Sequence, residues 1–402
     1  MKIIVGILKE TKNPPDRRVP VTPEIGKLIK THYNNVEVYV QPSEIRAFKE
    51  NEYTNIGLNV DNNLEKCNYI LGVKEVKLDT FIPNKTYMFF SHTGKKQPHN
   101  RVLLQQMSKG GITLIDYEYL TDKNNTRLVA FGRWAGIVGS YNGIMAYGLR
   151  TKLYNLKRAY QCFDKDDMLS QLDNVKLPPV KILITGGGRV ANGAMETLSH
   201  LKIKTVSPED YLTKTFNEPV VCRLDPQYYV KRKDNEQFDL EHFFKNPSEY
   251  KSTFLPYALS TDIYMACHFW DPLSPSFLKA EDYILPGFRI KVIADISCDL
   301  IYPIASTIRA SKIADPIYGY NPFTKQEDDA FATDNITVMA IDNLPGELPR
   351  NSSQDFAEAL YNNVFPSLFG EDKDGIIERA TILKNGKLTE RFSYLKDFLE
   401  GN

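Results

Sequence analysis

Two side chains that can transfer protons, Lys74 and His92, each follow directly on an apolar run of the sequence. Lys74 and Glu75 end the run Leu71-Gly72-Val73, and His92 follows Phe89-Phe90-Ser91. Such runs are typical of buried parallel strands, whose carboxyl ends border the ligand crevice. A partly buried lysine has a lowered pKa and histidine titrates near neutral pH, so both suit acid–base chemistry there. From the local sequence alone, a surface lysine and a structural histidine are the competing interpretations.

Two further segments carry charged side chains beside expected strands or helices. Asp116-Tyr117-Glu118 ends a third run, and Arg17-Arg18 precedes a helix start at Thr22-Pro23. An arginine there could hold a substrate carboxylate through a bidentate pair, although the local sequence favours a solvated face. His32, His99, His200 and His242 lie in polar or helical contexts, and His268 lies in an aromatic run that predicts packing. No metal-ligand spacing occurs among the histidines and cysteines, so we expect no metal site.

A glycine-rich turn follows the apolar run 180–185. Its sequence, Gly186-Gly187-Gly188-Arg189-Val190-Ala191, is a G-x-G-x-x-A pattern between an expected strand and an expected helix. The first glycine permits a tight turn, the second lets the backbone approach a pyrophosphate, and the alanine keeps helix and strand close. The helix N-terminus then offers N–H groups to phosphates. This context favours dinucleotide binding over a purely structural turn.

The acid that binds the cofactor ribose is expected about 20 residues after the turn. The next apolar segment, 204–206, ends at Ser207, and Glu209 and Asp210 come two or three residues later. Because no acid stands at the strand end, and because Arg189 could pair with a 2′-phosphate, the choice between NAD and NADP stays open.

The elements that must position these residues alternate between strands and helices. We expect strands at 3–8, 36–40, 69–73, 87–91 and 113–116, a glycine- and alanine-rich helix over 135–156, and a linker over 164–179. Further strands are expected at 180–185, 263–266, 292–296 and 337–341, an insertion or surface helix at 231–250, and a terminal helix at 354–365 that Pro366 stops. Strands separated by helices predict an α/β fold of two Rossmann-like parallel-sheet domains with a cleft between them.

The first domain is expected to be discontinuous. It comprises residues 1–150 and 342–402 and carries the substrate and catalytic residues, because the terminal helix folds back onto it. Residues 151–341 form the dinucleotide-binding Rossmann domain. A length of 402 residues suits two or three domains.

Composition excludes several classes of protein. The chain has 50 basic and 50 acidic residues and is 42% hydrophobic, which is ordinary for a globular protein and unsuited to a large phosphate-binding surface. No run approaches the ~20 apolar residues of a membrane span, and charge comes too early for a signal peptide. The five scattered cysteines indicate reduced thiols. We therefore expect a cytoplasmic protein with small-molecule partners and no nucleic-acid or membrane partner. The sequence is compatible with a homo-oligomer.

The motifs together resemble a known family, the lysine-forming saccharopine dehydrogenases and the lysine–ketoglutarate reductase domain of the bifunctional aminoadipic semialdehyde synthases. The same fold occurs in alanine dehydrogenase and in part of proton-translocating transhydrogenase. The resemblance covers almost the whole chain. Its motifs include Gly6-Ile7-Leu8-Lys9-Glu10, Arg17-Arg18-Val19-Pro20, Ile70-Leu71-Gly72-Val73-Lys74-Glu75, Ser91-His92-Thr93-Gly94-Lys95, Phe131-Gly132-Arg133-Trp134-Ala135-Gly136 and Asp342-Asn343-Leu344-Pro345. Gly94 departs from the pattern, because a bulkier residue is common there in the reductase domains.

The resemblance implies a role for each matching position. Lys74 and His92 match paired acid–base residues, and Arg18 matches an arginine that binds a substrate carboxylate. Glu75 and Glu118 match carboxylates that tune the lysine and histidine or meet a substrate amine, while Lys95 and Arg127 are expected to line a dicarboxylate pocket. Cofactor contacts are expected from Gly186, Gly188, Arg189, Val190, Ser207, Asp342 and Leu344.

The activity implied is an NAD- or NADP-dependent interconversion of saccharopine with lysine and 2-oxoglutarate. An alternative on the same fold is alanine dehydrogenase, which the Asp342-Asn343-Leu344-Pro345 and Asp116-Tyr117-Glu118 segments disfavour. An alternative of another class is a non-catalytic dinucleotide sensor. The presence of Lys74, His92 and Arg18 together argues against it.

Overall fold

The chain folds into two compact units, described here for residues 2–401 of a computed structural model. Unit 1 comprises Met1–Phe131 and Pro349–Asn402, and unit 2 comprises Gly132–Leu348. The sequence analysis placed these boundaries at residues 150 and 342. In the structure the first boundary lies earlier, after Phe131, and the second lies later, after Leu348. The difference arises because the long helix α4 (Gly132–Thr151) packs on the strands of unit 2, where Gly143 faces Ala294 and Met265. The fold class expected from the sequence, two α/β units with largely parallel sheets, is confirmed.

Unit 1 contains an eight-stranded sheet in the order β18-β17-β6-β5-β4-β1-β2-β3. Neighbouring strands from β6 to β3 pair in parallel, whereas β17 and β18 pair antiparallel. The strands are β1 (Ile3–Ile7), β2 (Val36–Val40), β3 (Asn59–Val60), β4 (Tyr69–Leu71), β5 (Thr86–Phe89), β6 (Thr113–Asp116), β17 (Thr381–Lys384) and β18 (Lys387–Leu388). The helices are α1 (Pro23–His32), α2 (Glu50–Thr54), α3 (Arg101–Lys109), α11 (Pro349–Asn363), α12 (Phe365–Phe369), α13 (Ile376–Ala380) and α14 (Lys396–Glu400).

Local sequence signals explain several element ends in unit 1. The Thr22 hydroxyl accepts a hydrogen bond from the Ile25 N–H at 3.3 Å, and Pro23 occupies the first turn of α1, as expected. Strands β4 and β5 end two residues before the predicted ends, because the chain there turns toward the polar segments that follow. The terminal helix α11 starts earlier than expected, and Pro366 lies in the first turn of α12 rather than ending a helix.

Unit 2 contains a second eight-stranded sheet, ordered β15-β14-β16-β13-β12-β7-β9-β8. Its parallel strands are β7 (Lys181–Thr185), β8 (Lys204–Thr205), β9 (Val220–Leu224), β12 (Ile263–Ala266), β13 (Val292–Asp295) and β16 (Ile336–Met339), with β14 (Ile317–Asn321) and β15 (Gln326–Asp328) antiparallel at one edge. The helices after α4 are α5 (Lys165–Ser170), α6 (Arg189–His200), α7 (Pro208–Thr213), α8 (Pro226–Tyr229), α9 (Leu240–Lys245) and α10 (Leu255–Leu259).

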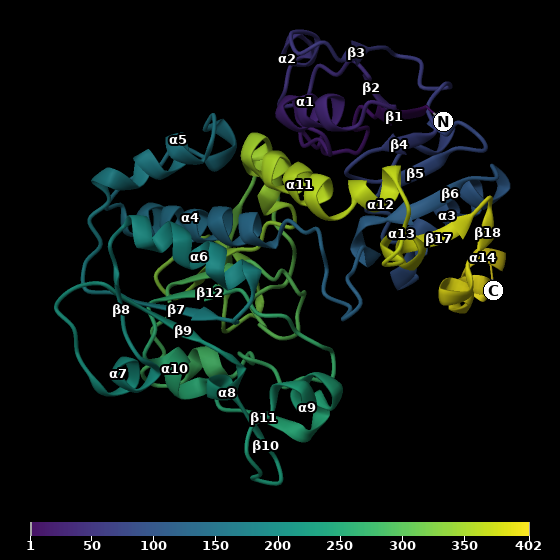
Figure 1. Ribbon diagram of the computed structural model, residues 1–402. Helices are drawn as coiled ribbons and strands as arrows, with labels where there is room; N and C mark the ends of the chain where they lie inside the picture. The colour runs from purple at the N-terminus through teal and green to yellow at the C-terminus, as the bar shows by residue number, and fades with distance from the viewer. Residues whose placement is uncertain (1, 402) are drawn as a thin grey trace. The chain divides into compact units, whose positions relative to one another are not determined.

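The expectation that small residues let another element approach α4 is confirmed. Helices α4 and α6 lie side by side (Figure 1), and a Cβ on Gly136 would lie 1.9 Å from the Val190 carbonyl oxygen. A Cβ on Gly193 would lie 2.0 Å from the Arg133 carbonyl oxygen. The two backbones therefore touch, and only glycine fits at either position.

Two segments differ from the sequence expectation. The predicted linker 164–179 contains helix α5, whose first turn is capped by the Asp164 carboxylate at 2.9 Å from the Asp167 N–H. The segment 231–250 forms most of a hairpin, β10 (Val230–Arg232) with β11 (Tyr250–Ser252), and carries α9 in its connection.

Candidate functional site

Four neighbouring strands of unit 1 bring the predicted catalytic residues to one edge of the sheet. Strands β6, β5, β4 and β1 are adjacent and parallel, so their carboxyl ends share that edge. Lys74 follows β4, His92 follows β5 and Glu118 follows β6. Arg18 lies on the segment after β1. The topology thus collects residues that are far apart in the sequence.

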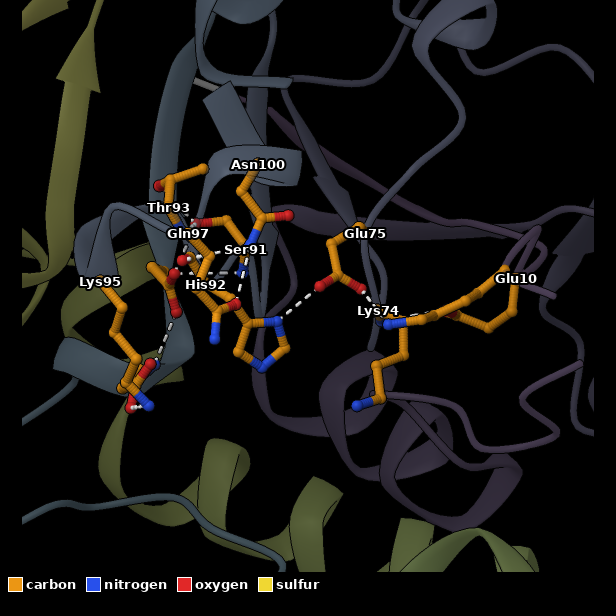
Figure 2. A network of polar contacts seen from close by, with 12 residues as sticks. Glu10, Lys74, Glu75, Ser91, His92, Thr93, Lys95, Gln97 and Asn100 are labelled. Atoms are coloured by element: carbon orange, nitrogen blue, oxygen red, sulfur yellow. Dashed lines mark hydrogen bonds and ion pairs between the residues drawn. The ribbon is translucent and has the colours of Figure 1, made fainter. Parts of the chain in front are cut away.

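The carboxylate of Glu75 joins two of these segments. Its Oε1 lies 2.5 Å from Nδ1 of His92 (Figure 2). Its Oε2 accepts a hydrogen bond from Nζ of Lys12 at 2.9 Å. Burial raises the pKa of Glu75, but the bonds from His92 and Lys12 outweigh it and lower the pKa to about 2. An ionised Glu75 holds Nδ1 and so fixes the orientation of the imidazole. The second ring nitrogen of His92, Nε2, then serves for proton exchange.

Lys74 is a partly buried amine whose pKa is lowered. Burial is the largest cause, and the positive charges of Arg18 and Lys12 act in the same direction. Figure 2 shows the side chains of Lys74 and His92 extending to the same side, away from the strands. A lowered pKa makes the amine easier to deprotonate, which favours a role in acid–base catalysis.

A tight turn presents His92. Its φ is 54°, in the left-handed region that a side chain rarely adopts. The buried carboxylate of Asp116 holds the preceding residue, because it accepts bonds from the Ser91 N–H at 3.1 Å and the Ser91 hydroxyl at 2.5 Å. A Cβ on Gly94 would lie 1.9 Å from the hydroxyl oxygen of Tyr119, so a larger residue here would require the Tyr119 side chain to move. The departure from the family pattern at Gly94 therefore has a local steric reason.

Arg18 is buried and already paired within the chain. Its Nε and Nη2 donate to the two carboxylate oxygens of Asp16 at 2.9 and 2.6 Å, and its guanidinium lies 4.2 Å from the centre of the Phe131 ring. The Arg18 charge holds the pKa of Asp16 below its usual range, against the effect of burial. The solvated face that the local sequence favoured is wrong for Arg18, because its side chain is only 3% exposed.

The remaining predicted substrate residues fall in two places. Nζ of Lys95 lies 2.8 Å from Oε1 of Glu118, so these residues form an ion pair at the same edge as His92. Arg127 lies on an exposed turn whose backbone bridges to Thr121. The role of Arg127 in substrate binding stays a prediction.

The glycine-rich turn of unit 2 has the geometry expected of it. Gly186 has φ 110°, and a Cβ there would lie 2.6 Å from the Cys267 carbonyl oxygen. Gly188 precedes the first turn of α6 with no side-chain cap, and a Cβ there would meet nothing within 4 Å. Ala191 is buried against the sheet. The turn therefore leaves open space at the N-terminus of a 12-residue helix, which suits the pyrophosphate of a dinucleotide.

The sequence analysis missed an acid beside this turn, Asp225. Strand β9, rather than β8, is the neighbour of β7, and Asp225 follows β9 directly. A Cβ on Gly187 would lie 2.6 Å from its Oδ1. Nε of Arg223 lies 3.5 Å from that oxygen, too far for a hydrogen bond, and Oδ1 is buried with no hydrogen-bond partner among residues 2–401. An acid at this strand end can accept bonds from ribose hydroxyls.

The other predicted cofactor residues have mixed positions. The Ser207 hydroxyl accepts a bond from the Asp210 N–H at 3.1 Å and caps α7, beyond the edge strand β8. Arg189 and Val190 begin α6. Asp342 is exposed after β16, whereas Leu344 is buried and packs near Gly139 of α4. Leu344 thus anchors the segment that carries Asp342.

The described part of the chain lacks two kinds of feature. Between residues 2 and 401, no helix has the length and apolar content needed to cross a membrane. The same residues contain no group of three or more histidine, cysteine or acidic side chains arranged to hold a metal. All five cysteines are free thiols, and four of them are buried.

Two parallel-sheet units, one with the Lys74, Glu75 and His92 cluster and one with a glycine-rich turn before a helix, define an α/β fold of the alanine dehydrogenase type. In agreement, a solved L-alanine dehydrogenase superposes with a TM-score of 0.62 over 99% of both chains, at 14% sequence identity. Residues 6–138 match the family model "Alanine dehydrogenase/PNT, N-terminal domain".

Curated relatives narrow the similarity. The chain is 29% identical to the alpha-aminoadipic semialdehyde synthase of Arabidopsis thaliana, over 99% of this chain and 42% of that protein. It is 28% identical to the saccharopine dehydrogenase [NAD(+), L-lysine-forming] of Emericella nidulans, over 89% of this chain and 90% of that one. The chain spans less than half the length of the synthase. These comparisons confirm the resemblance to lysine-forming saccharopine dehydrogenases and aminoadipic semialdehyde synthases that the motifs indicated.

Proposed function

We propose that this chain is a nicotinamide-dependent oxidoreductase that interconverts saccharopine with L-lysine and 2-oxoglutarate. The observation that carries the proposal is the cluster of Lys74, Glu75 and His92 at the carboxyl edge of the unit 1 sheet. The full-length similarity to lysine-forming saccharopine dehydrogenases supports the same substrate.

The chemistry of saccharopine needs what this cluster offers. Saccharopine is a secondary amine that bears several carboxylates. Loss of a hydride from the carbon beside its nitrogen gives an imine, and water adds to that carbon before the C–N bond breaks to give lysine and 2-oxoglutarate. A dinucleotide held at the glycine-rich turn of unit 2 would supply the hydride acceptor for this direction and the hydride donor for the other. The amine, the attacking water and the leaving amine each exchange a proton with a nearby acid or base.

The chain's own residues divide this work. Lys74, with its lowered pKa, exchanges a proton with the substrate amine, and His92 exchanges one with the water that attacks the imine. Glu75 keeps the imidazole oriented through the 2.5 Å contact. Arg18 receives a substrate carboxylate, and the Lys95–Glu118 ion pair lies at the same edge of the sheet.

The structure also supports a preference between the two cofactors. The residues of the turn fit a dinucleotide, since Gly188 leaves room over the α6 N-terminus and Asp225 stands beside Gly187. A carboxylate at that position accepts bonds from the ribose 2′- and 3′-hydroxyls and repels a 2′-phosphate. We therefore propose NAD as the preferred cofactor.

A nicotinamide absorbance assay on the purified protein tests the function in both directions. One arm offers saccharopine with NAD or NADP, and the other offers 2-oxoglutarate plus lysine with NADH or NADPH. Turnover in either arm supports the proposal. Turnover only with pyruvate plus ammonia would instead indicate an alanine dehydrogenase. Cofactor binding without turnover in any mixture would favour a non-catalytic dinucleotide sensor.

A further inference from the structure

We propose that Glu10 is a positioning residue for Lys74, because its carboxylate takes the place of a strand partner for the peptide groups that carry the lysine. The inference rests on the proposed function only in giving Lys74 a catalytic role. No motif role was assigned to Glu10 from the sequence, although it ends the segment Gly6-Ile7-Leu8-Lys9-Glu10.

The hydrogen bonds between β1 and β4 stop just before Lys74. The last bond joins the Leu8 N–H to the Leu71 carbonyl oxygen at 2.9 Å, and β1 ends at Ile7. On the other side of β4, the ladder to β5 continues further, because the Phe90 N–H donates to the Val73 carbonyl oxygen at 3.1 Å. The amides of Val73 and Lys74 therefore extend past β1 while their chain is still held by β5.

The Glu10 carboxylate satisfies these two amides. Oε1 accepts a bond from the Val73 N–H at 2.7 Å, and Oε2 accepts one from the Lys74 N–H at 3.0 Å. Figure 2 shows Glu10 reaching toward the backbone of Lys74 from the side opposite Glu75. Each oxygen holds a separate peptide group, so the carboxylate fixes both the position and the rotation of the Lys74 backbone.

This arrangement determines where the lysine amine lies. The Lys74 side chain is long and flexible, so a rotation of its peptide group moves Nζ by more than it moves the backbone. A misplacement of about 1 Å at a reacting group can lower a rate about 100-fold. Glu10 bonds the backbone N–H groups of Val73 and Lys74 through its carboxylate. It therefore acts through the backbone and is not a catalytic residue.

Glutamine in place of Glu10 breaks one of the two bonds selectively. The amide side chain keeps one acceptor oxygen, but its NH₂ group faces a peptide N–H and cannot accept a bond from it. Glu50 offers a matched control in the same unit, because its Oε1 accepts a bond from the Ser43 N–H at 2.7 Å far from the cluster in the sequence. Both substitutions, Glu10→Gln and Glu50→Gln, disturb a bond between a carboxylate and a backbone N–H.

The test compares these variants of the whole chain by two readouts. The first is kcat and KM with saccharopine and NAD. The second is the rate at which trinitrobenzenesulfonate modifies the amine of Lys74, followed by peptide mass spectrometry, with Lys95 as the internal reference. Thermal unfolding shows that each variant folds.

We expect Glu10→Gln to lower kcat by about 10- to 100-fold with KM changed by less than about 3-fold, since substrate-binding groups stay in place. The modification rate of Lys74 changes, that of Lys95 does not, and Glu50→Gln matches the wild type in both readouts. Wild-type turnover and wild-type Lys74 modification in Glu10→Gln would overturn the proposal. So would an equal effect of Glu50→Gln.

The outcome also separates this proposal from the proposed function. If the wild type does not turn over saccharopine but Glu10→Gln still alters the modification of Lys74, positioning stands and the substrate assignment fails. If Glu10→Gln does not fold, Glu10→Asp keeps both oxygens on a side chain one methylene shorter that cannot reach both amides. The same selective loss is expected from it, and unchanged values would overturn the proposal.

Discussion

Nδ1 of His92 lies 2.5 Å from Oε1 of Glu75, although the two residues follow different strands of the unit 1 sheet. The contact makes the residue next to Lys74 the orienting partner of His92. The acid–base roles proposed for Lys74 and His92 therefore depend on one cluster. Glu75 connects the two residues, because it follows Lys74 in the chain and contacts His92.

Replacing Glu75 tests the charge in this cluster through stability. Glu75→Gln is expected to lower the free energy of unfolding by about 1–3 kcal/mol at pH 7. Because the folded-state pKa of Glu75 is lowered to about 2 from an ordinary 4.5, the contribution is full above pH 4.5 and is lost as pH falls toward 2. Urea unfolding at pH 7 and at pH 3 measures the change.

The difference between wild type and Glu75→Gln should therefore be smaller at pH 3 than at pH 7. Glu44→Gln, at an exposed glutamate of the same unit, is the control and should change the free energy of unfolding by less than about 0.5 kcal/mol at either pH. A difference that grows as the pH falls would contradict the assignment.

The buried Arg18–Asp16 pair separates folding from substrate binding. Arg18→Gln leaves Asp16 buried without its bidentate partner, which costs about 3–5 kcal/mol of stability. The double variant Asp16→Asn with Arg18→Gln removes both charges and should recover most of that loss. Its KM for saccharopine should stay at least about 10-fold above that of the wild type, because no guanidinium meets the substrate carboxylate. A double variant with a normal KM would remove Arg18 from the site.

Two glycines of the same turn should respond differently to alanine. Gly186→Ala places a methyl group 2.6 Å from a backbone oxygen at φ 110°, so it should destabilise the fold by about 1–3 kcal/mol. Gly188→Ala meets nothing within 4 Å and should leave thermal stability unchanged. Its methyl group occupies the space over the α6 N-terminus, so NADH affinity, measured by calorimetry, should fall at least about 10-fold. Unchanged affinity would place the pyrophosphate elsewhere.

Asp225 should determine the choice of cofactor. The wild type is expected to use NADH at least about 10-fold more efficiently than NADPH, judged by kcat/KM, and Asp225→Ser should narrow the ratio by removing the repelling carboxylate. Glu209→Gln, on α7 after the outer strand β8, is the matched control and should leave the ratio unchanged. A change in the ratio in Glu209→Gln but not in Asp225→Ser would contradict the placement of the ribose beside the end of β9.

The sequence was sufficient for the edge that carries Lys74 and His92, because residues after parallel strands necessarily share an edge. It was insufficient for Asp225, because the order of strands in the sheet is not visible in a single sequence. The segment 204–206 follows the glycine-rich turn in the chain, but β9 lies next to β7 in space. The bonds from the Val73 and Lys74 amides to Glu10 could not be predicted either. They take the place of strand pairing, and the pattern of apolar residues does not show which backbone amides lack a strand partner. The reason for a glycine at position 94 could not be predicted from the sequence, because it depends on where the Tyr119 side chain lies in the fold.

The most direct test of the account is the turnover of Lys74→Met with saccharopine and NAD, measured beside NADH binding. We predict a kcat lowered by about 100- to 10,000-fold with an NADH dissociation constant within about 3-fold of the wild type, since the lysine exchanges protons and the turn in unit 2 is intact. Lys96→Met, at an exposed lysine of the same unit, should behave as the wild type. Wild-type turnover by Lys74→Met would contradict the assignment of this cluster as the acid–base centre.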